Sequence, residues 1–197
     1  MAARHFHPVS IDIIQDEHKR LSLVIRNMLH FVRSIAAGGP VPDLKIFRAM
    51  LYYISEFPDK VHHPKEDQYL FAKIKDRTHQ MDAALDALTE QHGKGEFLVR
   101  QLQEVLLHFE FSGQKEFPRF HELVEQYAKF YFAHMRNEED IVIPVARQVL
   151  NIMDWQEVDA AFLKNRHQLD DAGERYRFDQ LFTLIMSIHP NAEDAGD

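Results

Sequence analysis

Two pairs of histidine and glutamate carry the clearest chemical signal in this sequence. His62 precedes Glu66 by four residues, and His134 precedes Glu138 by the same interval. Residues four apart lie on one face of an α-helix, one turn apart, so each pair can present an imidazole and a carboxylate to one point. Imidazole together with carboxylate suits iron, manganese or zinc. The two pairs therefore indicate a metal site supplied by two helices.

His18 and His92 lie on the apolar stripes of two further predicted helices. A single inward histidine is more often a hydrogen-bonded core residue than a metal ligand. Six inward histidines and glutamates on four stripes are much harder to explain as packing, because even one unpaired buried charge is costly. Two metal ions, bridged by two carboxylates and held by terminal imidazoles, would remove that cost. The sequence thus predicts a two-metal centre.

The elements that position these residues are helical, because apolar residues recur at alternating intervals of three and four. Four long helices are predicted: one that ends before Gly38, one that begins near residue 43, one over 78–112 and one over 116–150. Pro58 and Pro64 predict a kink or break in the second helix. Their short connections predict an all-α fold, an antiparallel up-down-up-down four-helix bundle. Two shorter helices are expected near 155–164 and 178–188. Residues 1–150 would form the bundle with its metal site, and 151–197 a helical extension packed on the same domain.

Composition narrows the classes of function. The chain has 197 residues, a formal net charge of -8 and no Cys. The absence of Cys excludes disulfides, thiolate zinc sites and Cys-ligated iron–sulfur clusters. The negative charge disfavours nucleic acid as a partner. No apolar run approaches the roughly 20 residues that span a bilayer, and residues 1–10 lack a secretory signal, so a cytoplasmic protein without membrane contact is expected.

The motifs together resemble the hemerythrin/HHE cation-binding family over roughly residues 10–150. The resemblance rests on Asp16-Glu17-His18, His62-His63-Pro64-Lys65-Glu66-Asp67, Glu90-Gln91-His92 and His134-Met135-Arg136-Asn137-Glu138-Glu139. It implies two non-haem iron ions bridged by Glu66 and Glu138. It further implies His18 and His62 on one iron, and His92 and His134 on the other. Zinc, manganese or nickel could replace iron in recombinant protein.

One position departs from the oxygen-carrying members of that family. They are similar but have a fifth histidine one turn after the third-helix histidine, where this chain has Glu96. Either Glu96 ligates the second iron or a coordination position stays open. The resemblance then points to relatives associated with response to oxygen, nitric oxide or peroxide, and with iron–sulfur repair. A small diatomic molecule or peroxide is the expected ligand.

Other interpretations remain open at this level. A ferritin-like di-iron oxidase would use Glu-x-x-His pairs, and the sequence has none. A haem-binding bundle would leave the two glutamates without a role, and a purely structural metal site is compatible with every motif. Whether the protein is an enzyme is not decided. His63 and Glu139 are expected around the site or at the surface, and Tyr69, Tyr127, Phe130 and Tyr131 to pack around it. The residues Phe178, Leu181, Phe182 and Ile185 could cross the bundle or form a homodimer.

Overall fold

The protein is all-helical. The structure, a computed structural model, describes residues 7–171 and 173–188, and contains no strand among them. Residues 1–6, which make up most of the stretch considered for a secretory signal, lie outside this part. None of the described helices has both the length and the apolar character that crossing a membrane requires. The all-α expectation is confirmed.

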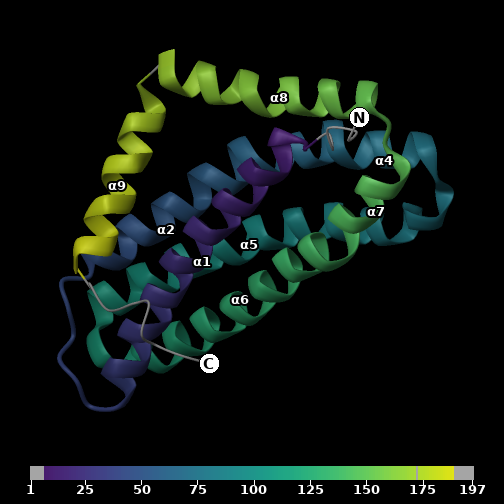
Figure 1. Ribbon diagram of the computed structural model, residues 1–197. Helices are drawn as coiled ribbons and strands as arrows, with labels where there is room; N and C mark the ends of the chain where they lie inside the picture. The colour runs from purple at the N-terminus through teal and green to yellow at the C-terminus, as the bar shows by residue number, and fades with distance from the viewer. Residues whose placement is uncertain (1–6, 172, 189–197) are drawn as a thin grey trace.

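Four long helical segments form a bundle (Figure 1). They are α1 (Val9–Ala36); the second segment, comprising α2 (Lys45–Phe57), η1 (Pro58–His62), α3 (His63–Lys65), η2 (Glu66–Phe71) and α4 (Ala72–Arg77); α5 (Asp82–Ser112); and the fourth segment, comprising α6 (Phe117–Asn137), η5 (Glu138–Val142) and α7 (Ile143–Val149). Short 3-10 turns, η3 (His79–Met81) and η4 (Gly113–Glu116), precede α5 and α6. Around the bundle α1 contacts α2, α2 contacts α5, α5 contacts α6, and α6 contacts α1.

The two segments that carry the His-x-x-x-Glu pairs are wound more loosely than an α-helix. Three stretches in them, η1, η2 and η5, are π-helical, with hydrogen bonds to the fifth rather than the fourth preceding residue. Pro64 lies between His62 and Glu66 in α3, and Pro144 follows Glu138 near the start of α7. A proline has no N–H to donate to the turn before it. Of the kink or break expected at Pro58 and Pro64, a break is absent: both prolines lie in helical turns, Pro58 in η1 and Pro64 in α3, and the segment stays helical.

The predicted polar residues lie between two apolar clusters. One cluster is built on residues such as Ile25, Met28 and Phe120, and the other on Ile14, Leu70 and Val142. Along each long segment, the inward histidine or glutamate stands where the chain passes from one cluster to the other. Water is excluded on both sides of this polar layer, so its charges have to be balanced within the layer.

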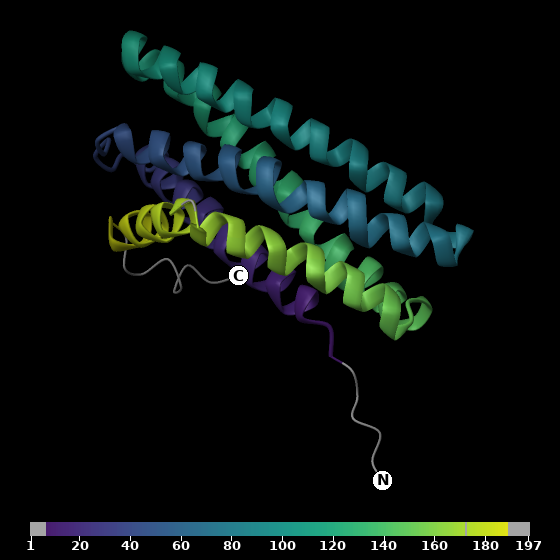
Figure 2. The ribbon, with the colours of Figure 1, turned by 90° about the horizontal axis from the view of Figure 1, so that it is seen from above.

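Two C-terminal helices, α8 (Ile152–Asp171) and α9 (Glu174–Ile188), lie along the outside of the bundle (Figure 2). Both are longer than the predicted ranges. α8 contacts α1 and η2, and its Trp155, Val158 and Phe162 belong to the second apolar cluster. α9 contacts α1 and α2, and its Ile185 is fully buried in the first cluster. The apolar stripe of α9 therefore packs within this chain.

Candidate metal centre

The structure brings the six predicted ligands together in the polar layer. His18, His62, Glu66 and Glu138 form one group of candidate metal ligands, and His63, His92 and His134 form another. In each group the ligand atoms lie within 4.8 Å of one another, and every member is buried. The groups adjoin, because His92 and His134 each have Nε2 within 3.7 Å of a glutamate of the first. All four long segments contribute.

The carboxylate of Glu66 spans the two histidine pairs. Its Oε1 lies 3.3 Å from Nε2 of His62, on the same helical segment. Its Oε2 lies 3.7 Å from Nε2 of His92, on α5. One oxygen atom therefore faces each pair, as a carboxylate that bridges two ions must.

The two carboxylate oxygens of Glu138 face the two histidine pairs in the same way. Its Oε2 lies 3.3 Å from Nε2 of His18. Its Oε1 lies 3.5 Å from Nε2 of His92 and 3.3 Å from Nε2 of His134. The four histidines thus fall into a His18/His62 end and a His92/His134 end, with both carboxylates between them.

A hydrogen bond on the outer nitrogen fixes the orientation of each of these four histidines. Three of the acceptors are carboxylates, which can only accept, so Nδ1 carries the proton and a neutral ring keeps its Nε2 lone pair for the centre. The bonds run from Nδ1 of His18 to Glu139 (2.8 Å), of His62 to Glu17 (2.6 Å), of His92 to Asp67 (3.1 Å) and of His134 to Gln91 (3.0 Å). Each acceptor is the sequence neighbour of an inward ligand on another segment, a signal that sequence reasoning did not use.

Nε2 of His18 and Nε2 of His62 lie 3.0 Å apart and are hydrogen-bonded to each other. Six other buried atoms at the centre lack hydrogen-bond partners. These atoms are both carboxylate oxygens of Glu66, both of Glu138, and Nε2 of His92 and His134. Buried polar atoms are nearly always hydrogen-bonded, and buried carboxylates without a partner are especially costly. A cation bound among these oxygens and nitrogens would satisfy them all. The residues present therefore fit a metal centre.

His63, which the sequence placed around the site or at the surface, lies inside the cluster. Its ring is 4% exposed and stacks on His92, with ring centroids 4.0 Å apart and planes 10° apart. Its Nε2 hydrogen-bonds to the Tyr131 hydroxyl at 2.9 Å. An imidazole binds metal in the plane of its ring, so two parallel stacked rings cannot both point at one ion. In this arrangement His63 stacks on His92 and bonds to Tyr131. The wide turns of η1 and η2 allow adjacent His62 and His63 both to face inward.

Glu96 is not brought into either group. Its side chain is half exposed and accepts a hydrogen bond from Arg100 at 3.0 Å. Of the aromatic residues expected around the site, Tyr131 contacts His63 and His134. Tyr69, in contrast, is 41% exposed, because it falls on the outer side of the π-helical turn η2.

Without a metal ion the cluster balances its charge with protons. Burial would lower the pKa of the histidines, but the carboxylates in contact with their rings raise it, to about 10 for His18, about 9 for His62 and about 10 for His92. Burial would raise the pKa of Glu138, but the surrounding imidazoles hold it well below its usual range. Burial and the neighbouring charge of His92 lower the pKa of His63 and His134.

These shifts predict how the metal-free protein responds to pH. A histidine whose pKa is raised on folding stabilises the fold below its unfolded value of 6.5, and this contribution is lost as pH rises through the folded value. We therefore expect the metal-free protein to melt at progressively lower temperature from about pH 6.5 to about pH 10. Melting with chelator present, measured across this range, checks it. Metal-loaded protein is the control: its ligands bind deprotonated, so its dependence should be weaker. A flat metal-free profile would contradict the protonated cluster.

A buried lysine connects the His18/His62 end to α8. Lys65 is 2% exposed, and its Nζ lies 3.6 Å from Oε1 of Glu17 and 4.9 Å from the ring centroid of Phe162. Glu17 is the acceptor that orients His62. Burial would raise the pKa of Glu17, but its contacts with His62 and Lys65 lower it, so the carboxylate is ionised.

Lys65→Met is expected to lower the free energy of unfolding by about 3 kcal/mol, because it removes a buried cation that, together with His62, balances the carboxylate of Glu17. Lys60→Met is the matched control: Lys60 pairs with Glu56 in the same segment, but its side chain is 66% exposed, so about 0.5 kcal/mol is expected. Urea denaturation of the three proteins measures both values. Equal losses would show that Lys65 contributes no more than a surface lysine.

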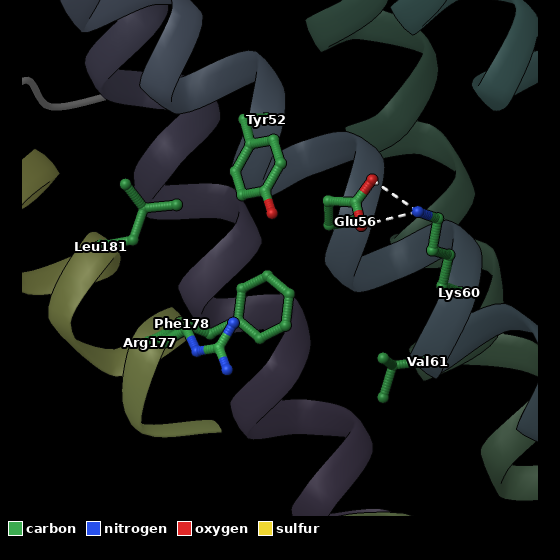
Figure 3. Close-up of a pocket in the computed structure, with 7 residues that line it drawn as sticks. All are labelled: Tyr52, Glu56, Lys60, Val61, Arg177, Phe178 and Leu181. Atoms are coloured by element: carbon green, nitrogen blue, oxygen red, sulfur yellow. Dashed lines mark hydrogen bonds and ion pairs between the residues drawn. The ribbon is translucent and has the colours of Figure 1, made fainter. Parts of the chain in front are cut away.

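A separate surface groove lies away from the centre, between the second segment and α9 (Figure 3). Tyr52, Val61, Phe178 and Leu181 line it together with the charged residues Glu56, Lys60 and Arg177. Lys60 donates to both oxygens of Glu56 at 2.6–2.7 Å. None of the six predicted ligands lines this groove, so it is not part of the metal centre.

Fold and site define a class of protein, a helical bundle with a buried histidine and glutamate cluster for metal binding. The family model of the hemerythrin HHE cation-binding domain matches residues 9–146. The chain belongs to the hemerythrin HHE family, as its motifs predicted, and is a metal-binding protein. No curated protein and no solved structure gave a match.

Proposed function

We propose that this protein holds two non-haem iron ions within an antiparallel up-down-up-down bundle, and that it senses or scavenges a small molecule such as oxygen, nitric oxide or peroxide. His18 and His62 would hold one ion and His92 and His134 the other, with Glu66 and Glu138 shared. The observation that carries this proposal is the division of each carboxylate, one oxygen toward each histidine pair.

The chain's own groups would prepare this site. Glu17, Asp67, Gln91 and Glu139 hold the imidazoles with Nε2 inward before any ion binds. The apolar clusters on both sides exclude water, which strengthens the attraction between carboxylate and cation. When bound, an iron pair supplies reversible redox chemistry and coordination of small ligands. The four imidazoles and two carboxylates leave a coordination position for such a ligand, because Glu96 belongs to neither ligand group and is bonded to Arg100.

The test is spectroscopic. Protein loaded with iron without oxygen is exposed separately to oxygen, nitric oxide and peroxide, and the absorption spectrum is followed. A new absorption band with at least one of them supports the proposal. An unchanged spectrum with all three would leave a metal that serves the fold alone. Rapid turnover of added Fe(II) into a mineral core would instead point to a ferritin-like oxidase.

A further inference from the structure

An opening in the surface reaches the metal centre from its His92/His134 end. It lies between α5 and the stretch around α3 and η2, and its lining residues are His63, Pro64, Asp67, Gln68, His92, Gly93 and Glu96. Its volume is about 240 Å³, several times the roughly 30 Å³ that one water molecule takes up in the liquid. A molecule of two to four atoms therefore fits inside it.

We propose that small uncharged molecules reach the metal centre through this opening, and that Gly93 keeps it clear. This inference rests on the proposed function. It states the route by which the ligand enters, the end of the centre that it reaches first, and that the ligand is uncharged.

The inner wall of the opening belongs to the cluster itself. His92 is 7% exposed, compared with 3% for each of His18, His62 and His134. His92 and His63 both line the opening. The opposite end is closed more fully, because Glu17 and the buried Lys65 cover His62, and Phe162 of α8 covers Lys65. His92 is therefore the most exposed of the six predicted ligands.

Gly93 has no other structural reason to be glycine. A Cβ built at this position meets no atom within 4 Å, and the residue is exposed in the middle of α5. A glycine there costs about 1 kcal/mol relative to alanine. Gly95 differs, since its Cβ would lie 3.3 Å from the Tyr131 ring. Packing explains Gly95, whereas Gly93 faces open space and lines the same opening as His92.

The charged residues that line the opening favour uncharged ligands over anions. Asp67 and Glu96 contribute carboxylates, the first bonded to His92 and Thr89 and the second to Arg100. Carboxylates that line an opening repel anions. Oxygen, nitric oxide and hydrogen peroxide are uncharged and are not repelled.

The test places a side chain in the opening without touching a ligand. Gly93→Leu fills the space over His92, and Ala87→Leu is the matched control, a small exposed residue of α5 outside the lining. In iron-loaded protein, stopped-flow measurement of nitric oxide association should show about a tenfold slower rate for Gly93→Leu. Gly93→Ala should have a small effect and Ala87→Leu none. Iron content is measured first, so that lost metal is not mistaken for lost access. An unchanged rate in iron-replete Gly93→Leu overturns the inference.

A second readout needs no metal, and so separates this inference from the proposed function. Dissolved oxygen is paramagnetic and relaxes the nuclear spins of protons that it approaches. In metal-free protein, its effect on the ring protons of His92 should exceed that on His18, and Gly93→Leu should remove the difference. Absence of bound iron would defeat the proposed function but leave this result standing. Equal relaxation of His92 and His18 in the unmodified chain would overturn the route.

Discussion

Glu138→Ala is expected to lower the iron content of the protein from about two ions per chain to below about one. Glu138 has an oxygen within 3.5 Å of Nε2 of His18, His92 and His134, and neither oxygen has a hydrogen-bond partner. A carboxylate in that position contacts both ends of the centre, so its removal weakens both ion sites. Metal content is measured by mass spectrometry of the element after dialysis against a weak chelator.

Glu96→Ala is the control, because its carboxylate is exposed and bonded to Arg100. It should keep its full iron content. Glu66→Ala should behave like Glu138→Ala, and His63→Ala should lose less metal than either, since its ring is stacked on His92. Equal iron in Glu138→Ala and the unmodified protein would remove Glu138 from the ligand set. Loss of iron in Glu96→Ala would restore Glu96 as a ligand.

Removal of the metal is expected to lower the melting temperature by about 5–10 °C. A ligand present at 100 times its dissociation constant stabilises the folded state by about 2.7 kcal/mol, and for a chain of this size each kcal/mol corresponds to about 2–4 °C. The physical cause is the pair of buried carboxylates, which without metal have only imidazolium ions to balance them. Calorimetry of loaded protein, with and without a strong chelator, measures the shift.

The Glu66→Ala/Glu138→Ala double variant provides the control for this shift, since it lacks both carboxylates that share the ions. Chelator should leave its melting temperature unchanged. If the unmodified protein melted at the same temperature with and without metal, the layer would be balanced by protons alone. The ion would then contribute nothing to the fold.

Much of the fold and site follows from local sequence periodicity. His18, His62, His92 and His134 interrupt apolar stripes with helical spacing, so the spacing by itself predicts that they face inward. The same spacing places Glu66 and Glu138 one turn after a histidine. The all-α class follows from the same pattern, because it persists with few Gly and Pro interruptions.

The remaining features depend on contacts between segments. A prediction from periodicity assumes α-helical winding throughout. Pro64 and Pro144 lie beside wider turns, which change the residues that face inward. His63 joins the cluster for that reason. Glu17 orients a histidine of another segment, and although it is the sequence neighbour of His18, the sequence does not give the partner that it bonds. The predicted ranges for α8 and α9 are too short, since the burial of these helices depends on the surface of the bundle.

The most direct test of the two-ion centre is the amount of iron per chain. Protein produced with added iron and purified without oxygen would be measured for iron and for protein concentration. The arrangement of Glu66 and Glu138 between two histidine pairs predicts about two iron ions per chain. A value near zero, in protein whose helical content is intact, would mean that the buried histidines and glutamates neutralise one another, and would contradict the di-iron proposal.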